Sequence, residues 1–174
     1  MDLAEIARRF ELHDLYTEYA ECLDSDALER WPEFFVDDCR YRIISGENYE
    51  AGLPLGLIYA TSKNMLHDRV SALREANIYE PQRYRHIVSG VRIIGNSGNA
   101  AVPPADSRGG SGPDGFDVTA NFVVIRTMQD GAMIVFAAGR YIDSVVRGDA
   151  GFLFARKDVV LDSRQIDTLL AIPL

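Results

Sequence analysis

The sequence predicts an α+β fold in which N-terminal helices pack on one face of a curved, mostly antiparallel sheet. Apolar residues recur at helical spacing up to about residue 77, whereas four later segments are rich in β-branched and aromatic residues and are broken by turn-formers. Helices followed by a strand meander are typical of this class. A chain of 174 residues with 47% hydrophobic content suits one domain spanning residues 1–174.

An amphipathic helix is predicted from Leu3 to Leu23. Its apolar residues recur at steps of three to five positions, and charged residues lie largely between them. These apolar residues are Leu3, Ile6, Phe10, Leu15, Tyr19 and Cys22.

A short second helix is predicted next. Asp24 or Ser25 can cap it, because a side-chain oxygen accepts an unpaired backbone N–H at a helix start. Pro32 limits its length. Its apolar stripe consists of Leu28, Trp31 and Phe35. A strand is then expected from about Cys39 to Ile44.

The middle of the chain predicts a short apolar strand near residues 57–59 and a further helix. Thr61 or Ser62 begins that helix, which runs to about Asn77. Its apolar residues have helical spacing and are Met65, Leu66, Val70 and Leu73.

Four long strands are predicted in the second half, and we expect them to form an antiparallel meander. They cover residues 83–96, 115–128, 131–146 and 152–161. Between the first two lies a segment dense in glycine and proline, residues 96–115, which we expect to form an exposed, flexible loop. This order of elements resembles the cone-shaped fold of nuclear transport factor 2 (NTF2), ketosteroid isomerases and scytalone dehydratase, which leaves a pocket between helices and sheet.

His86 is the candidate for chemistry. Strand alternation places it on one face with Tyr84, Val88, Gly90 and Arg92. Asp24, at the junction of the two N-terminal helices, is its expected partner, since in a cone fold that junction lies over the sheet. A carboxylate there fixes the imidazole tautomer and raises its basicity.

Two interpretations of this pair stay open. In the first, Asp24 and His86, with Tyr16 or Tyr19, form an acid–base pocket that resembles that of scytalone dehydratase. That enzyme uses a second histidine from the following strand, and residues 116–128 contain none. In the second, the pair is a buried hydrogen-bonded tie between helix and sheet, because buried polar groups must be paired.

Composition excludes several functions. The net charge of -8 without long basic runs argues against a nucleic acid or an anionic membrane as partner. No apolar stretch of about 18 residues exists, and the acidic N-terminus lacks a signal-peptide pattern, so we expect a cytoplasmic protein. Cys22 and Cys39 match no zinc or iron–sulfur spacing. His13 and His67 are expected on solvated helix faces. We therefore expect no metal or cofactor in this chain.

Three stretches carry a family resemblance: "DSDALERWPEFFVDDCRYRI", "LPLGLIYATSKNMLHDRVSALREANIYEPQRYRHIVSGVRI" and "DTLLAIPL". The chain resembles the small (β) subunit of bacterial aromatic-ring-hydroxylating oxygenases. It is most similar to subunits of the terephthalate dioxygenase and salicylate 5-hydroxylase kind, whose substrates are monocyclic aromatic carboxylates.

The resemblance implies a non-catalytic assembly subunit without catalytic residues of its own. Its partners would be a large α subunit, carrying a Rieske [2Fe–2S] cluster and a mononuclear iron, and other β subunits in an α3β3 hexamer. Strand-borne arginines suit a polar subunit interface or an ordinary solvated surface. They are Arg83, Arg85, Arg92, Arg126 and Arg140. The alternatives are a stand-alone dehydratase or isomerase and a protein whose pocket binds an aromatic ligand.

Overall fold

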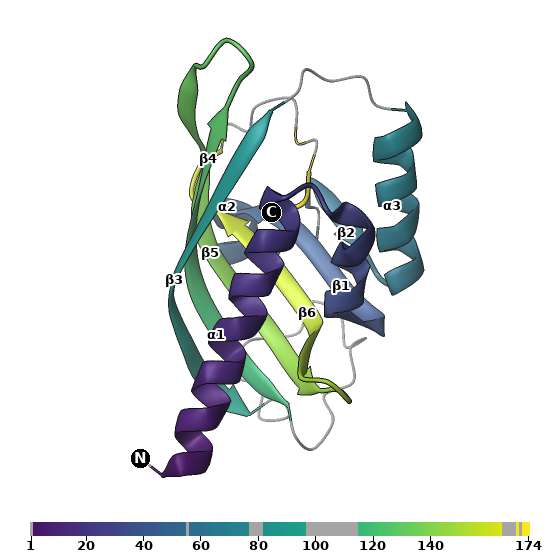
Figure 1. The fold of residues 1–174 in the computed structure, drawn as a ribbon. Helices are drawn as coiled ribbons and strands as arrows, with labels where there is room; N and C mark the ends of the chain where they lie inside the picture. The colour runs from purple at the N-terminus through teal and green to yellow at the C-terminus, as the bar shows by residue number, and fades with distance from the viewer. Residues whose placement is uncertain (1, 55, 77–81, 97–114, 165–169, 171) are drawn as a thin grey trace.

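The computed structural model describes residues 2–54, 56–76, 82–96, 115–164, 170 and 172–174. Its elements (Figure 1) are α1 (Leu3–Asp24), the 3-10 helix η1 (Leu28–Phe34), β1 (Phe35–Ser45), α2 (Gly46–Glu50), β2 (Ile58–Ala60), α3 (Lys63–Ala76), β3 (Arg83–Asn96), β4 (Phe116–Thr127), β5 (Met133–Arg147) and β6 (Phe152–Leu161). The predicted α+β class is confirmed. Residues 97–114 of the predicted loop lie outside the described residues, and the single domain over residues 1–174 stays a prediction.

The strands form one six-stranded sheet in the order β2-β1-β6-β5-β4-β3. Strands β3 to β6 pair antiparallel in chain order, which confirms the predicted meander. Strand β1 joins this meander by pairing parallel with β6, and β2 pairs antiparallel with β1. Phe35, which the sequence suggested as part of a helix stripe, is the first residue of β1. The sheet is therefore mostly antiparallel, with one parallel pair, β1 with β6.

Helix α1 crosses one face of this curved sheet, and α3 stands beside β1 and β2 (Figure 1). Aromatic residues fill the space between helices and sheet, and Trp31, Tyr41 and Phe154 are fully buried there. The short helix α2 lies on the opposite face, where Tyr49 packs on a small cluster. That cluster consists of Ile44, Ile142 and Val160. No helix among the described residues is long and apolar enough to cross a membrane.

A β-bulge at Gly90 divides β3 into two parts. Even-numbered side chains face the core before the bulge, and odd-numbered side chains face it afterwards. The register against β4 shifts between Ser89 and Arg92, and Gly90 has a φ of +63°, a conformation that favours glycine. Before the bulge, Tyr84 and His86 point into the core, as predicted. Beyond it the alternation inverts, so Arg92 is exposed. The prediction that Arg92 shares a face with His86 is wrong, because simple alternation ignores the extra residue.

The predicted helix starts had mixed outcomes. Ser62 Oγ accepts a hydrogen bond from the backbone N of Met65 at 3.4 Å, so the cap of α3 is confirmed. The N-cap of η1 is Ala27, without a side-chain hydrogen bond, so the capping prediction for Asp24 and Ser25 is wrong. Ser25 instead donates to the carbonyl of Glu21 at 2.7 Å, and Asp24 bonds to β3.

Candidate functional site

Asp24 and His86 are in direct contact. Asp24 Oδ1 lies 2.7 Å from His86 Nδ1, and both carboxylate oxygens accept from the backbone N of His86 at 3.0 Å. Because a carboxylate only accepts, Nδ1 carries the shared proton. The predicted contact between the helix junction and the strand is confirmed. It joins residues 62 positions apart in the sequence.

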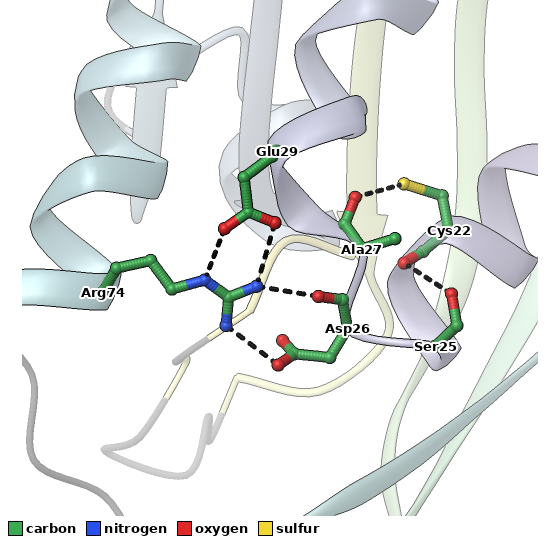
Figure 2. A network of polar contacts seen from close by, with 6 residues as sticks. All are labelled: Cys22, Ser25, Asp26, Ala27, Glu29 and Arg74. Carbon is green, nitrogen blue, oxygen red and sulfur yellow. Dashed lines mark hydrogen bonds and ion pairs between the residues drawn. The ribbon is translucent and has the colours of Figure 1, made fainter.

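The position of Asp24 follows from the turn that ends α1 (Figure 2). Ser25 Oγ donates to the Cys22 carbonyl at 3.4 Å, and the Cys22 thiol donates to the Ala27 carbonyl at 3.1 Å. Asp26 has a φ of 57°, a left-handed conformation that reverses the chain toward η1. The last residue of α1 is thereby held above β3.

Arg74 of α3 fastens the same turn (Figure 2). Its guanidinium donates to both carboxylate oxygens of Glu29, at 2.8 and 3.2 Å, and to the side chain and carbonyl of Asp26, at 2.8 and 2.7 Å. These hydrogen bonds lower the pKa of Glu29 and raise that of Arg74. The turn, and with it Asp24, is thus tied to α3 as well as to the sheet.

The His86 ring is closed off from solvent. Its side chain is 0% exposed, and Nε2 has no hydrogen-bond partner among the described residues. A hollow between α1 and η1 and a second hollow between α1 and β3 are lined by other residues. An acid–base catalyst must reach its substrate. The observed geometry suits a tie between helix and sheet better than a catalytic pair.

Tyr16, the tyrosine suggested for the acid–base pocket, is engaged elsewhere. Its hydroxyl donates to Asp143 Oδ2 at 2.5 Å, and the same oxygen accepts from Lys157 Nζ at 3.0 Å. Both charged side chains are 0% exposed. Tyr19, the other tyrosine considered, donates to the carbonyl of Leu174 at 2.9 Å. The structure therefore separates these hydroxyls from the Asp24–His86 contact.

Lys157 sits inside a cage of aromatic rings. Its Nζ lies 3.5 Å from the ring centroid of Tyr141 and between 4.4 and 5.0 Å from three others. The other three rings belong to Tyr16, Tyr19 and Phe154. Such contacts compensate in part for the loss of hydration around a buried cation.

Burial shifts the pKa values of this cluster. It raises the pKa of Asp143 and lowers that of Lys157 to about 8, because both charged forms lose hydration. Burial also raises the pKa of Tyr16 well above its usual range, with Asp143 adding to the effect. Within the part of the chain that the structure describes, the Tyr141 hydroxyl and Asp143 Oδ1 have no hydrogen-bond partner. The charged pair is thus held away from solvent between helix and sheet.

The described residues present no metal-binding set. All histidines and cysteines lie in the described part, where no group of three His, Cys, Asp or Glu side chains is placed to hold a metal ion. Cys22 and Cys39 are buried. Burial raises the pKa of the Cys39 thiol to about 11, which keeps it protonated rather than reactive.

The sequence did not single out Asp143 and Lys157. Asp143 is a single charge between Ile142 and Ser144, whereas Lys157 lies in a run of three charges, Arg156 to Asp158, and the sequence does not show which of the three faces the core. The paired strands carry a bulge between Ser144 and Val145, opposite Ala155, and this bulge turns Lys157 toward the core.

Comparison with known proteins gives consistent matches. Residues 18–103 match the model of the family described as "Ring hydroxylating beta subunit". The chain is 41% identical over 165 residues to the anthranilate 1,2-dioxygenase small subunit of Burkholderia cepacia, covering 95% of this chain and 93% of that protein. It is 43% identical over 156 residues to subunit beta 1 of the terminal oxygenase component of terephthalate 1,2-dioxygenase from Comamonas sp, covering 90% and 92%.

A solved structure extends the match to three dimensions. It was assigned as the β subunit of an aromatic-ring-hydroxylating dioxygenase from Novosphingobium aromaticivorans DSM 12444. The two folds superpose with a TM-score of 0.80 at 34% sequence identity, over 99% of this chain and 100% of the other. The predicted cone-shaped, NTF2-like architecture is confirmed.

Proposed function

The chain belongs to the family of ring-hydroxylating dioxygenase β subunits, and from this premise we propose that it is the non-catalytic assembly subunit of an oxygenase for an aromatic carboxylate. The observation that carries the proposal is the 41% identity to a dioxygenase small subunit over 95% of the chain. The interior polar groups support it, because the His86, Asp143 and Lys157 side chains are each 0% exposed and so do not reach a substrate.

The metal chemistry belongs to the partner in this proposal. A large α subunit supplies the Rieske [2Fe–2S] cluster and the mononuclear iron, and it pairs with this chain in an α3β3 hexamer located in the cytoplasm. A Rieske centre needs two cysteines and two histidines as ligands. The residues present here do not fit it, since Cys22 and Cys39 are both buried and His86 Nδ1 is engaged by Asp24.

The substrate class rests on the relatives. Anthranilate and terephthalate, the compounds in their names, are both monocyclic aromatic carboxylates. We assign the same class to the oxygenase that contains this chain. The α subunit selects the substrate, so this chain contributes to activity by holding the assembly together.

Co-expression tests the proposal. The chain is produced with a large-subunit gene that encodes a Rieske motif in the same genome, and the product is sized by light scattering. We expect a complex of both subunits that oxidises an aromatic carboxylate with O2 when a reductase or a chemical reductant supplies the electrons. Recovery of this chain alone, without bound α subunit, contradicts the proposal.

The dehydratase or isomerase alternative is not favoured, because the His86 side chain is 0% exposed. Its test is separate. Turnover of a small cyclic substrate by the purified chain, lost in His86→Asn while the fold is kept, is the result that would revive it.

A further inference from the structure

The last residues of the sequence lie inside the fold, near α1 and β1 (Figure 1). Ile172 is 3% and Leu174 0% exposed, and both belong to the main apolar core. Residues 172–174, which we call the tail, are part of no helix and of none of the described strands. The tail can therefore leave the core without breaking any of the described strand pairs.

Two buried tyrosine hydroxyls hold the tail by the same oxygen. Tyr19 of α1 and Tyr41 of β1 both donate to the Leu174 carbonyl oxygen, at 2.9 and 3.1 Å. The Tyr41 hydroxyl also accepts from the backbone N of Leu174 at 3.0 Å. Trp31 Nε1 donates to the Tyr19 hydroxyl at 3.2 Å, which fixes its orientation. Two O–H donors thus converge on one point in the core, and a molecule that replaces the tail must bring an acceptor to it.

Arg69 of α3 adds positive charge to this point. Its Nε is buried and has no hydrogen-bond partner among the described residues. Burial raises the pKa of Tyr41, whereas the hydrogen bond to Leu174 and the positive charge of Arg69 act against that rise. Asp143 acts on the same hydroxyl, but Lys157 balances its charge at 3.0 Å. Two hydroxyl donors and a nearby guanidinium suit a carboxylate better than a neutral oxygen.

The surroundings of the two hydroxyls are otherwise apolar. The Trp31 ring lies edge-on to Tyr41 with centroids 5.1 Å apart, and the Phe34 ring lies edge-on to Tyr19 at 5.6 Å. The Leu174 side chain packs in the same apolar cluster. The tail therefore presents an acceptor oxygen and a branched apolar group to a site that has donors at one point and apolar walls around it.

We propose that the tail is a plug in a binding site for a small apolar monocarboxylate, and that such a molecule displaces it. Isocaproate has the carbon skeleton of leucine without the amino group. Its carboxylate accepts from Tyr19 and Tyr41, and its branched end takes the place of the Leu174 side chain. Because the tail competes with the ligand, the fraction of molecules with the tail released sets the apparent affinity. The site lies within this chain and needs no α subunit.

Loosening the tail tests the proposal. The tail variant, Ile172→Ser/Leu174→Ser, removes two buried apolar side chains and leaves both hydroxyl donors in place. Leu53→Ser/Leu57→Ser, at leucines that are 48% and 56% exposed, is the matched control. Isothermal titration calorimetry measures the binding of sodium isocaproate and of isohexanol, the uncharged alcohol with the same skeleton. Circular dichroism reports the fold, and Leu174→Ala replaces the tail variant if that variant does not fold.

We expect the tail variant to bind isocaproate at least about tenfold more tightly than the wild-type chain and the control, because its site is open in a larger fraction of molecules. Isohexanol is expected to bind at least about tenfold more weakly than isocaproate, since it has no negative charge. A tail variant that binds isocaproate no more tightly than the control overturns the plug. Equal affinity for the acid and the alcohol overturns the assignment of a carboxylate.

Two further measurements locate the ligand. Tyr41→Phe in the tail variant removes one donor and should weaken isocaproate binding at least about fivefold, and unchanged binding overturns the proposal. Hydrogen exchange of the C-terminal peptide follows the Leu174 N–H, which is bonded to Tyr41. Isocaproate should make this peptide exchange faster in the wild-type chain, because the ligand displaces it. Exchange that stays unchanged or slows places the ligand elsewhere and overturns the proposal.

Discussion

The Asp24 carboxylate contacts both the backbone and the imidazole ring of His86. It accepts a hydrogen bond from the His86 backbone N at 3.0 Å and lies 2.7 Å from His86 Nδ1. One side chain at the end of α1 thus satisfies two buried donors of β3. The contact closes α1 onto the sheet at a position where the His86 side chain has no solvent exposure.

Asp24→Asn is expected to lower the free energy of unfolding by about 2 kcal/mol, because a hydrogen bond to a charged group contributes about 1.5–3 kcal/mol. Asp26→Asn is the matched control, since its side chain is 62% exposed and bonds to Arg74 at the surface. That change is expected to have a much smaller effect. Urea unfolding followed by Trp31 fluorescence measures both. Equal effects of the two substitutions would show that the Asp24–His86 contact adds nothing special.

Asp143 and Lys157 form a buried ion pair, and the effects of substituting them on the free energy of unfolding should be strongly non-additive. Lys157→Met leaves the Asp143 carboxylate buried without its counter-charge, still accepting from Tyr16, and Asp143→Asn leaves the ammonium without its counter-charge. Loss of one member of a buried pair costs about 3–5 kcal/mol, whereas loss of both is often nearly neutral.

We therefore expect the double variant Asp143→Asn/Lys157→Met to be more stable than either single variant. A double-mutant cycle by chemical denaturation gives the coupling energy. The pair Lys63 and Glu33, 2.9 Å apart with the glutamate 64% exposed, is the control cycle, with little coupling expected. Additive effects at Asp143 and Lys157 would contradict the expectation.

Sequence periodicity predicted most of the fold because each segment buries one face. The α1 stripe and the four long strands follow from spacing alone. Asp24 was paired with His86 because the helix junction lies over the sheet in a cone fold, and alternation placed His86 correctly because it precedes the Gly90 bulge. The same reasoning failed at Arg92 and missed Lys157. In each case a bulge adds one residue to a strand and inverts all later side chains.

Gly90 should be intolerant of a side chain. Its φ is +63°, and an added Cβ would lie 3.1 Å from Asn121 Nδ2. Gly90→Ala is expected to cost about 1–2 kcal/mol from backbone strain, with a further cost from crowding against β4. Gly52→Ala measures the cost of backbone strain alone, because Gly52 has a φ of +66° with nothing within 4 Å of an added Cβ. Thermal unfolding of both variants gives the comparison, and a smaller effect at Gly90 than at Gly52 would argue against a rigid bulge.

Alkaline pH should unfold this protein through its buried phenols. Burial raises the pKa of Tyr16, Tyr19 and Tyr141 well above the usual range, and that of Tyr41 also rises. Above about pH 10 the unfolded chain releases phenol protons that the folded chain keeps, so the free energy of unfolding falls by up to about 1.4 kcal/mol per pH unit for each tyrosine.

Lys157 has the opposite effect on the free energy of unfolding, and it acts over a lower pH range. Its pKa is about 8 in the folded chain and about 10.4 in the unfolded chain. Between these values the unfolded chain holds more protons, so Lys157 makes stability rise with pH. Stability should therefore increase modestly from pH 8 to 10 and then fall steeply.

Denaturation curves from pH 7 to 11.5, read together with phenolate absorbance, test this profile. The buried tyrosines should ionise only as the Trp31 signal reports unfolding, because each phenolate would otherwise lose its hydration inside the core. Tyr141→Phe removes a hydroxyl that bonds to none of the described residues, so it should be neutral or stabilising at pH 7 and should make the fall above pH 10 shallower. Ionisation of all eight tyrosines near pH 10 in a chain that stays folded would contradict the buried aromatic cluster.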